Sequence, residues 1–233
     1  MPTGSKDGVV GIRGVSMIRK PNGCSGCPLE YKGMGFVPDQ LAPDPEYVFV
    51  GEAPGKNEVE QGKPFVGQAG HVLKAWLMKA VPEVQIASEK NKITLMNTLR
   101  CLPPEIHGRP YPKGEEKELA EKQCRQYDNF GNAKTVVLFG ESSQRCHFGP
   151  ELDNEDASDR RLQRDVKGVM GRIGRVYEKA DRRWIFAPHP AWILRQPALV
   201  EHGQQALKIA ANKDKVAEVD YVKWDEAITH LLD

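Results

Sequence analysis

Five cysteines are spread through the chain, and four of them could share one metal centre. Cys24 and Cys27 are separated by two residues, a spacing that can place two thiolates on one metal or form a redox pair. Cys101 and Cys124 follow as distant single residues. Four thiolates can close a zinc site or hold an iron–sulfur cluster, with unrelated buried thiols as the alternative. Cys146 stands alone after a later apolar run.

A second group of residues surrounds a glycine-rich turn. The apolar run 47–50 reads as a buried strand, and it leads directly into the sequence GEAPG. Gly51 and Gly55 allow the backbone to approach a ligand closely, and Glu52 supplies a carboxylate at the strand end. Farther on, Phe65 could offer its ring to a flat ligand. A plain strand–turn–helix with a core phenylalanine is the alternative.

Two more polar side chains follow apolar runs. Asn97 comes after the run 93–96 and can both donate and accept, so it could read an imide edge or serve a turn. His189 follows the run 184–187 and lies between two prolines, which restrict its backbone. This restriction suits a positioned hydrogen-bond donor, although a core histidine is the alternative.

Basic residues occur in two places where they could meet phosphates. The first is the proline-rich segment around 102–110, where Arg100, His107, Arg109 and Lys113 could also be ordinary solvated charges. The second is Arg195, which follows an apolar Trp-Ile-Leu sequence that could form a wedge in a duplex.

The elements that must position these residues alternate along the chain. Apolar runs at 47–50, 93–96, 135–140 and 184–187 predict four strands, and helical periodicity appears at 72–80, 115–127 and 200–211. We expect an α/β fold, a three-layer αβα sandwich around a central four-stranded parallel sheet. The carboxyl ends of parallel strands are where such sheets bind ligands.

The flanking segments carry less information. We expect one domain over 1–233, with a flexible lead-in at 1–20 and a helical appendage at 213–233. Residues 151–165 read as an exposed helix or insertion, and 168–179 as a hairpin or irregular strands.

Composition limits the possible partners. The 233 residues hold 33 Lys and Arg against 32 Asp and Glu, so a nucleic-acid surface would have to be a local patch. The sequence contains no run of 18 apolar residues, so no membrane span is expected. The first residues lack the apolar core of a signal peptide. A cytoplasmic protein is the expectation.

Taken together, these segments resemble the uracil-DNA glycosylase superfamily, most closely its iron–sulfur family 4. The resemblance covers roughly residues 24–210 and is specific as an ordered set. Its pieces are Cys24 and Cys27, GEAPG (51–55), Glu58, GKPFVGQAG (62–70), MNTLRCLPP (96–104), VVLFG (136–140) and HPAWILR (189–195).

The resemblance implies an enzyme that flips uracil out of DNA and hydrolyses its N-glycosidic bond, leaving an abasic site. Phe65 would stack on the uracil, Asn97 would read its edge and His189 would donate to its carbonyl, in a pocket that includes Gly51 and Ala53. Glu52 would lie near the sugar and the attacking water. Ile193 would fill the gap in the duplex, with Arg195 and Arg109 contacting DNA. Cys24, Cys27, Cys101 and Cys124 would hold a structural 4Fe–4S cluster, with zinc as the alternative.

Some positions depart from the family pattern. The interval between Cys101 and Cys124 is long, which leaves Cys146 as an alternative ligand. Ala53 and Ala191 stand where other branches have polar residues, so the carboxylate must come from Glu52 or, as a second choice, Glu58.

The expected partner is uracil-containing DNA, single- or double-stranded. We expect a monomer that is associated with the nucleoid when it binds DNA. We expect no association with a membrane. Two alternatives stay open: a uracil-DNA crosslinking protein that uses His107, and a metal-stapled DNA binder without catalysis.

Overall fold

The centre of the fold is a five-stranded sheet with the strand order β2-β1-β5-β7-β6. The computed structural model describes residues 18–80, 90–106, 109–158, 172–197 and 200–212. The strands are β1 (Tyr47–Gly51), β2 (Ile93–Asn97), β5 (Thr135–Phe139), β6 (Val176–Lys179) and β7 (Arg182–Ala187). β2, β1, β5 and β7 are parallel, which confirms the predicted four-stranded parallel sheet.

The sheet has one more strand than the sequence predicts. β6 pairs antiparallel with β7 through a tight turn in which Ala180 and Asp181 have positive φ. For 168–179 the sequence predicts a hairpin or irregular strands. The hairpin instead extends to β7, and within the described part of 168–179 the one strand is β6. Residues 172–175 precede it in turns, and 168–171 lie outside the described residues.

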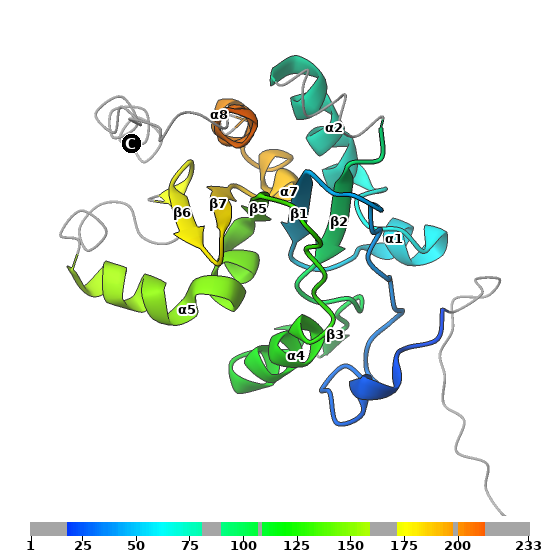
Figure 1. Cartoon of the computed structure of the whole chain (residues 1–233). Coiled ribbons are helices and arrows are strands. Elements are labelled where there is room, and N and C mark those ends of the chain that lie inside the picture. Colours follow the sequence, from blue (N-terminus) through cyan, green and yellow to red (C-terminus); the bar gives the residue numbers. More distant parts are fainter. Residues whose placement is uncertain (1–17, 81–89, 107–108, 159–171, 198–199, 213–233) are drawn as a thin grey trace, which may run out of the picture.

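Helices cover both faces of the sheet, so the three-layer arrangement is confirmed (Figure 1). α2 (Gln68–Ala80), α7 (Pro190–Ile193) and α8 (Val200–Ala211) lie on one face. α4 (Glu115–Arg125) and α5 (Gly140–Ser158) lie on the other, and α5 changes direction at Phe148. The remaining elements are short: η1 (Asn22–Cys24), α1 (Lys56–Gln61) and the hairpin of β3 (Glu105–Ile106) and β4 (Arg109–Pro110).

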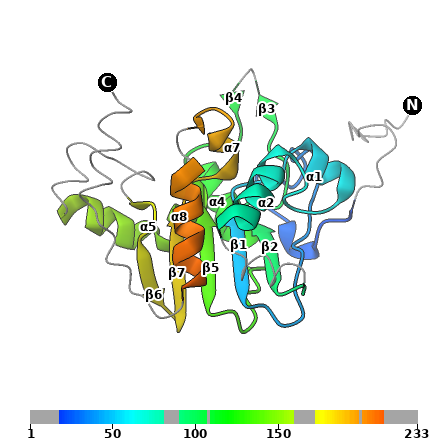
Figure 2. The ribbon, with the colours of Figure 1, turned by 90° about the horizontal axis from the view of Figure 1, so that it is seen from above.

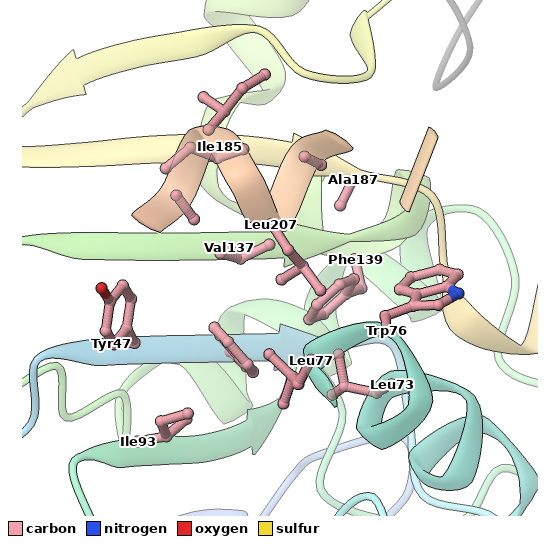
Figure 3. Packing of buried hydrophobic residues seen from close by; sticks show 14 residues of the cluster. Tyr47, Leu73, Trp76, Leu77, Ile93, Val137, Phe139, Ile185, Ala187 and Leu207 are labelled. Carbon is pink, nitrogen blue, oxygen red and sulfur yellow. The ribbon is translucent and has the colours of Figure 1, made fainter. Parts of the chain in front are cut away.

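Alternate residues of the strands feed two separate cores, as the two-residue period of a strand requires. Phe49, Val137 and Ile185 pack against α2 and α8, where Trp76 and Leu207 lie deeply buried between helix and sheet (Figure 3). The intervening residues of the same strands pack against Phe148 and Leu152 of α5. A sheet buried on both faces explains why its strands appear as continuous apolar runs.

Some predictions fall on residues that the structure does not describe. These are the lead-in before residue 18, the appendage at 213–233 and the part of 151–165 beyond Ser158; residues 151–158 are helical, in α5. The single-domain prediction for 1–233 remains a prediction. Within the described ranges, no helix is long and apolar enough to cross a membrane.

Candidate active site and cysteine cluster

Gly51, Asn97 and Phe65 meet at the carboxyl end of the sheet. Gly51 ends β1 and pairs in register with Asn97, which ends β2. A Cβ atom at residue 51 would lie 2.5 Å from Asn97 Oδ1 and 2.9 Å from Phe65 Cζ. Glycine at this position leaves room for both side chains, and any larger residue would displace at least one of them.

The loop that carries Phe65 is held by Glu58. The buried Glu58 carboxylate accepts hydrogen bonds from the Gly55 N–H at 3.0 Å and the Gly67 N–H at 2.7 Å. It thus joins the GEAPG turn to the Phe65 loop. Phe65 itself has a positive φ of 55°, and its ring meets Phe139 edge-on at 6.1 Å between centroids. Both Glu58 oxygens are engaged with backbone, so the geometry favours Glu52 as the carboxylate available for chemistry.

His189 lies at the end of β7 and caps the short helix α7. Its Nδ1 accepts a hydrogen bond from the Ala191 N–H at 3.2 Å, which leaves the proton of a neutral ring on Nε2. Burial lowers the pKa of His189, and nearby Glu52 opposes that shift. The ring is therefore neutral near pH 7, with its Nε2–H as the donor. His189 lies against Gly140, because a Cβ added to Gly140 would lie 3.0 Å from the Cβ of His189.

An open cleft of about 450 Å³ lies beside these strand ends. Its lining includes Glu52, Ala53, Trp192 and Arg195 together with His189. Phe65 and Asn97 are not among the lining residues. The structure therefore brings Phe65 and Asn97 together at Gly51, and Glu52 and His189 together at the cleft. Phe65 is linked toward the cleft by its contact with Phe139, which precedes the cleft-lining Gly140.

The predicted DNA contacts are described only in part. Arg195 is exposed at the cleft. The backbone of Ile193 lies in α7 and that of Arg109 in the β3–β4 hairpin, and Figure 2 shows both elements at the same end of the molecule. His107 lies outside the described residues. The prediction that Arg100 could face phosphates is wrong, because Arg100 is buried and bonded to Asp39 and Asp128.

Two ionic contacts at the site were not foreseen from the sequence. Lys117 Nζ lies 3.1 Å from Glu52 Oε1 across the cleft mouth, and 3.8 Å from Glu121 one helical turn farther along α4. The four-residue spacing of Lys117 and Glu121 was the only local signal.

Arg100 also donates a hydrogen bond to the Cys124 carbonyl at 2.7 Å.

Cys24, Cys27, Cys101 and Cys124 are neighbours, and Cys146 is apart from them. Cys101 and Cys124 lie in one buried apolar cluster, with Cys27 packed against it. Burial raises the pKa of Cys101 to about 12; the Lys20 ammonium opposes this rise, and the three other thiols of the group add to it. Burial also raises the pKa of Cys146 to about 12, but its charged neighbours are Glu121, Arg125 and Asp128.

The four neighbouring thiols are the residue type that binds zinc or an iron–sulfur cluster. Within the described ranges, no three Cys, His, Asp or Glu side chains are close enough to hold one metal ion. Zinc would require four sulfur atoms at about 2.3 Å from one centre. A 4Fe–4S cluster also takes four Cys thiolates, so the residue types of this set suit either centre.

Comparison with known proteins shows the family to which the chain belongs. The family model described as "Uracil DNA glycosylase superfamily" matches residues 38–214. The chain is 28% identical over 214 residues to the type-4 uracil-DNA glycosylase of Sulfurisphaera tokodaii, covering 87% of this chain and 90% of that protein. It is 30% identical over 192 residues to the type-4 enzyme of Archaeoglobus fulgidus, covering 82% and 88%. It is 29% identical over 180 residues to the type-4 enzyme of Pyrobaculum aerophilum, covering 76% of this chain and 82% of that protein. These matches confirm the resemblance to family 4, and the chain belongs to the uracil-DNA glycosylase superfamily.

Proposed function

We propose that this protein is a uracil-DNA glycosylase that extrudes uracil from DNA and hydrolyses its N-glycosidic bond. The observation that carries the proposal is the neutral His189 donor at the end of β7, beside a cleft that also holds the Glu52 carboxylate. The relatives named above are glycosylases of this type, which supports the same activity here.

Base recognition falls to Phe65 and Asn97. The ring of Phe65 provides a stacking face, and the Asn97 amide can both donate to and accept from the uracil edge. Gly51 makes their approach possible because it has no Cβ. Ala53 completes the wall beside Glu52.

Extrusion of the nucleotide costs a few kcal/mol of stacking and pairing, least at a mispair such as U·G. Arg195 at the cleft, together with Ile193 and Arg109 on the two elements beside it, would offset that cost through phosphate and wedge contacts. Single- and double-stranded DNA are both candidate substrates, and single strands avoid the pairing part of the cost.

Bond cleavage places positive charge on the sugar and negative charge on the departing base. The Nε2–H of His189 would stabilise the base, as a fixed donor does in an oxyanion hole. Glu52 would stabilise the sugar and orient the attacking water. Because His189 stays neutral, it would donate a hydrogen bond without first binding a proton.

Cys24, Cys27, Cys101 and Cys124 would hold a 4Fe–4S cluster, with zinc as the alternative; their closeness in the fold supports a shared centre. When bound, it supplies a structural cross-link. It would join the segment around Cys24 and Cys27, the loop that follows Asn97 at the end of β2, and helix α4. We propose a monomer that works on nucleoid DNA in the cytoplasm.

A release assay tests the proposal. Purified protein is incubated with single-stranded, U·G and U·A oligonucleotides, and abasic sites are revealed by alkaline cleavage, with thymine in place of uracil as the control substrate. Cleavage that depends on uracil is expected. Binding that ignores uracil, without cleavage, would favour a non-catalytic DNA binder instead. A denaturation-resistant adduct that disappears in His107→Ala would favour the crosslinking alternative.

A further inference from the structure

The Glu52 side chain is held at one oxygen and open at the other. Its backbone is fixed, because its carbonyl accepts a hydrogen bond from the Leu99 N–H at 2.9 Å. The side chain is 49% exposed at the cleft, so nothing but a specific contact restricts its rotamers. Oε1 accepts from Lys117 Nζ at 3.1 Å. In the part of the chain that the structure describes, Oε2 has no hydrogen-bond partner and remains available.

Lys117 is itself held in place by its own helix. It lies in the first turn of α4, where its N–H donates to the Gly114 carbonyl at 3.0 Å. Its ammonium lies between Glu52 and Glu121, at 3.1 Å and 3.8 Å. Two carboxylates on one ammonium restrict a side chain that would otherwise lose much conformational entropy on ordering.

Glu121 is anchored in turn from the next helix. Its Oε1 accepts from Ser142 Oγ of α5 at 2.7 Å, and the residue is buried. A continuous line of polar contacts therefore runs from Ser142 through Glu121 and Lys117 to Glu52. It begins in the buried contact between α4 and α5 and ends at the cleft, where a reacting sugar would lie.

We propose that Lys117 is a positioning residue that orients the Glu52 carboxylate for the reaction. This inference rests on the proposed function. Binding of Oε1 restricts the carboxylate and leaves Oε2 without a partner at the cleft, and the ammonium offsets the repulsion between this carboxylate and an entering DNA phosphate. Small misplacements of a reacting group can cost up to about 10²-fold in rate, so an ordered Glu52 has a kinetic value that a mobile one lacks.

Single-turnover kinetics on a single-stranded uracil oligonucleotide test the assignment. The variants are Lys117→Met, Lys117→Arg, Glu52→Gln and the double variant Glu52→Gln/Lys117→Met. Lys122→Met is the matched control, because Lys122 is exposed on the same helix and lines only the neighbouring hollow of about 920 Å³. Thermal midpoints are measured for every variant.

Lys117→Met is expected to lower the maximal rate constant about tenfold or more. The DNA concentration that gives half of that maximal rate constant should change less than about twofold. Lys117→Arg should recover most of that loss, and Lys122→Met should match the wild type. In the Glu52→Gln background the Lys117 substitution should cost nothing further, since the group that it positions is gone.

Two results would overturn the inference while leaving the glycosylase activity standing. One is a Lys117→Met variant that raises the DNA concentration needed for half-saturation but keeps the maximal rate constant, which would make Lys117 a plain DNA contact. The other is an equal loss of rate in both Glu52 backgrounds. A wild-type protein that releases no uracil would refute the proposed function, and this inference with it.

Discussion

Gly51 and Asn97 are register partners at the ends of β1 and β2, and Asn97 Oδ1 occupies the space that a side chain on residue 51 would need. Gly51→Ala would place a methyl group 2.5 Å from that oxygen and 2.9 Å from Phe65 Cζ. We expect uracil release to fall at least tenfold and stability to fall by about 1–3 kcal/mol from overpacking. Gly149→Ala is the control, because nothing lies within 4 Å of its added Cβ. Equal activity of the two variants would contradict the assignment of Asn97 and Phe65 to the pocket.

His189→Ala should reduce the single-turnover rate constant by ~10²–10³, the typical cost of removing one donor to developing negative charge. His71→Ala, on the exposed side of α2, should leave it unchanged.

The lowered pKa of His189 leads to a prediction about the pH dependence of the rate. Because burial lowers the pKa of His189 below its usual value, the ring is already neutral at pH 8 and remains so at slightly acidic pH. Protonation is not needed for donation, so the His189-dependent rate should not rise between pH 8 and 6.5. A rate that rises as pH falls through this window would show that a charged ring is the donor.

The proposed 4Fe–4S cluster should give the purified protein a brown colour and broad visible absorption. Cys124→Ser should abolish both, whereas Cys146→Ser should retain them. The reason is that Cys124 neighbours the other three thiols and Cys146 does not. Iron and sulfide analysis of both variants checks the result. A colourless wild type that contains one zinc per chain would replace the cluster with a zinc site. Loss of colour in Cys146→Ser would reassign the fourth ligand.

Arg100→Met should destabilise the protein by about 3–5 kcal/mol, because it leaves buried Asp39 and Asp128 without their cation. Chemical unfolding measures the loss. Adding Asp39→Asn and Asp128→Asn to the same variant should recover part of it, since no uncompensated charge remains. Lys92→Met, which breaks a more exposed pair with Asp44, should cost much less than Arg100→Met does.

Acid should destabilise the fold partly through His147. Burial, aided by Arg125, Lys179 and Arg100, lowers the pKa of His147 to about 3. Below about pH 6.5 the unfolded chain binds a proton there that the folded protein does not, so stability falls by up to about 1.4 kcal/mol per pH unit. Between pH 7 and 5, His147→Gln should therefore lose less of its thermal midpoint than the wild type does. His71→Gln should follow the wild type; equal pH slopes in all three proteins would remove His147 from the account.

Local patterns in the sequence were enough to predict the parallel sheet and the strand-end positions of Gly51, Asn97 and His189. Each strand is buried on both faces, so it is an uninterrupted apolar run, and the polar residue that follows must lie at the edge. The C-x-x-C spacing likewise pointed to a shared thiol site, because both cysteines lie in one turn.

Only the tertiary structure decided the contacts between distant segments. It added β6 to the sheet edge, joined Glu58 to Gly67, buried Arg100 between two aspartates and brought Lys117 to Glu52. It also separated Cys124 from Cys146, which their spacing could not do. These contacts depend on how α4 and the loops pack against the sheet. A charged or thiol side chain carries no local periodicity that reveals its partner, so packing had to supply it.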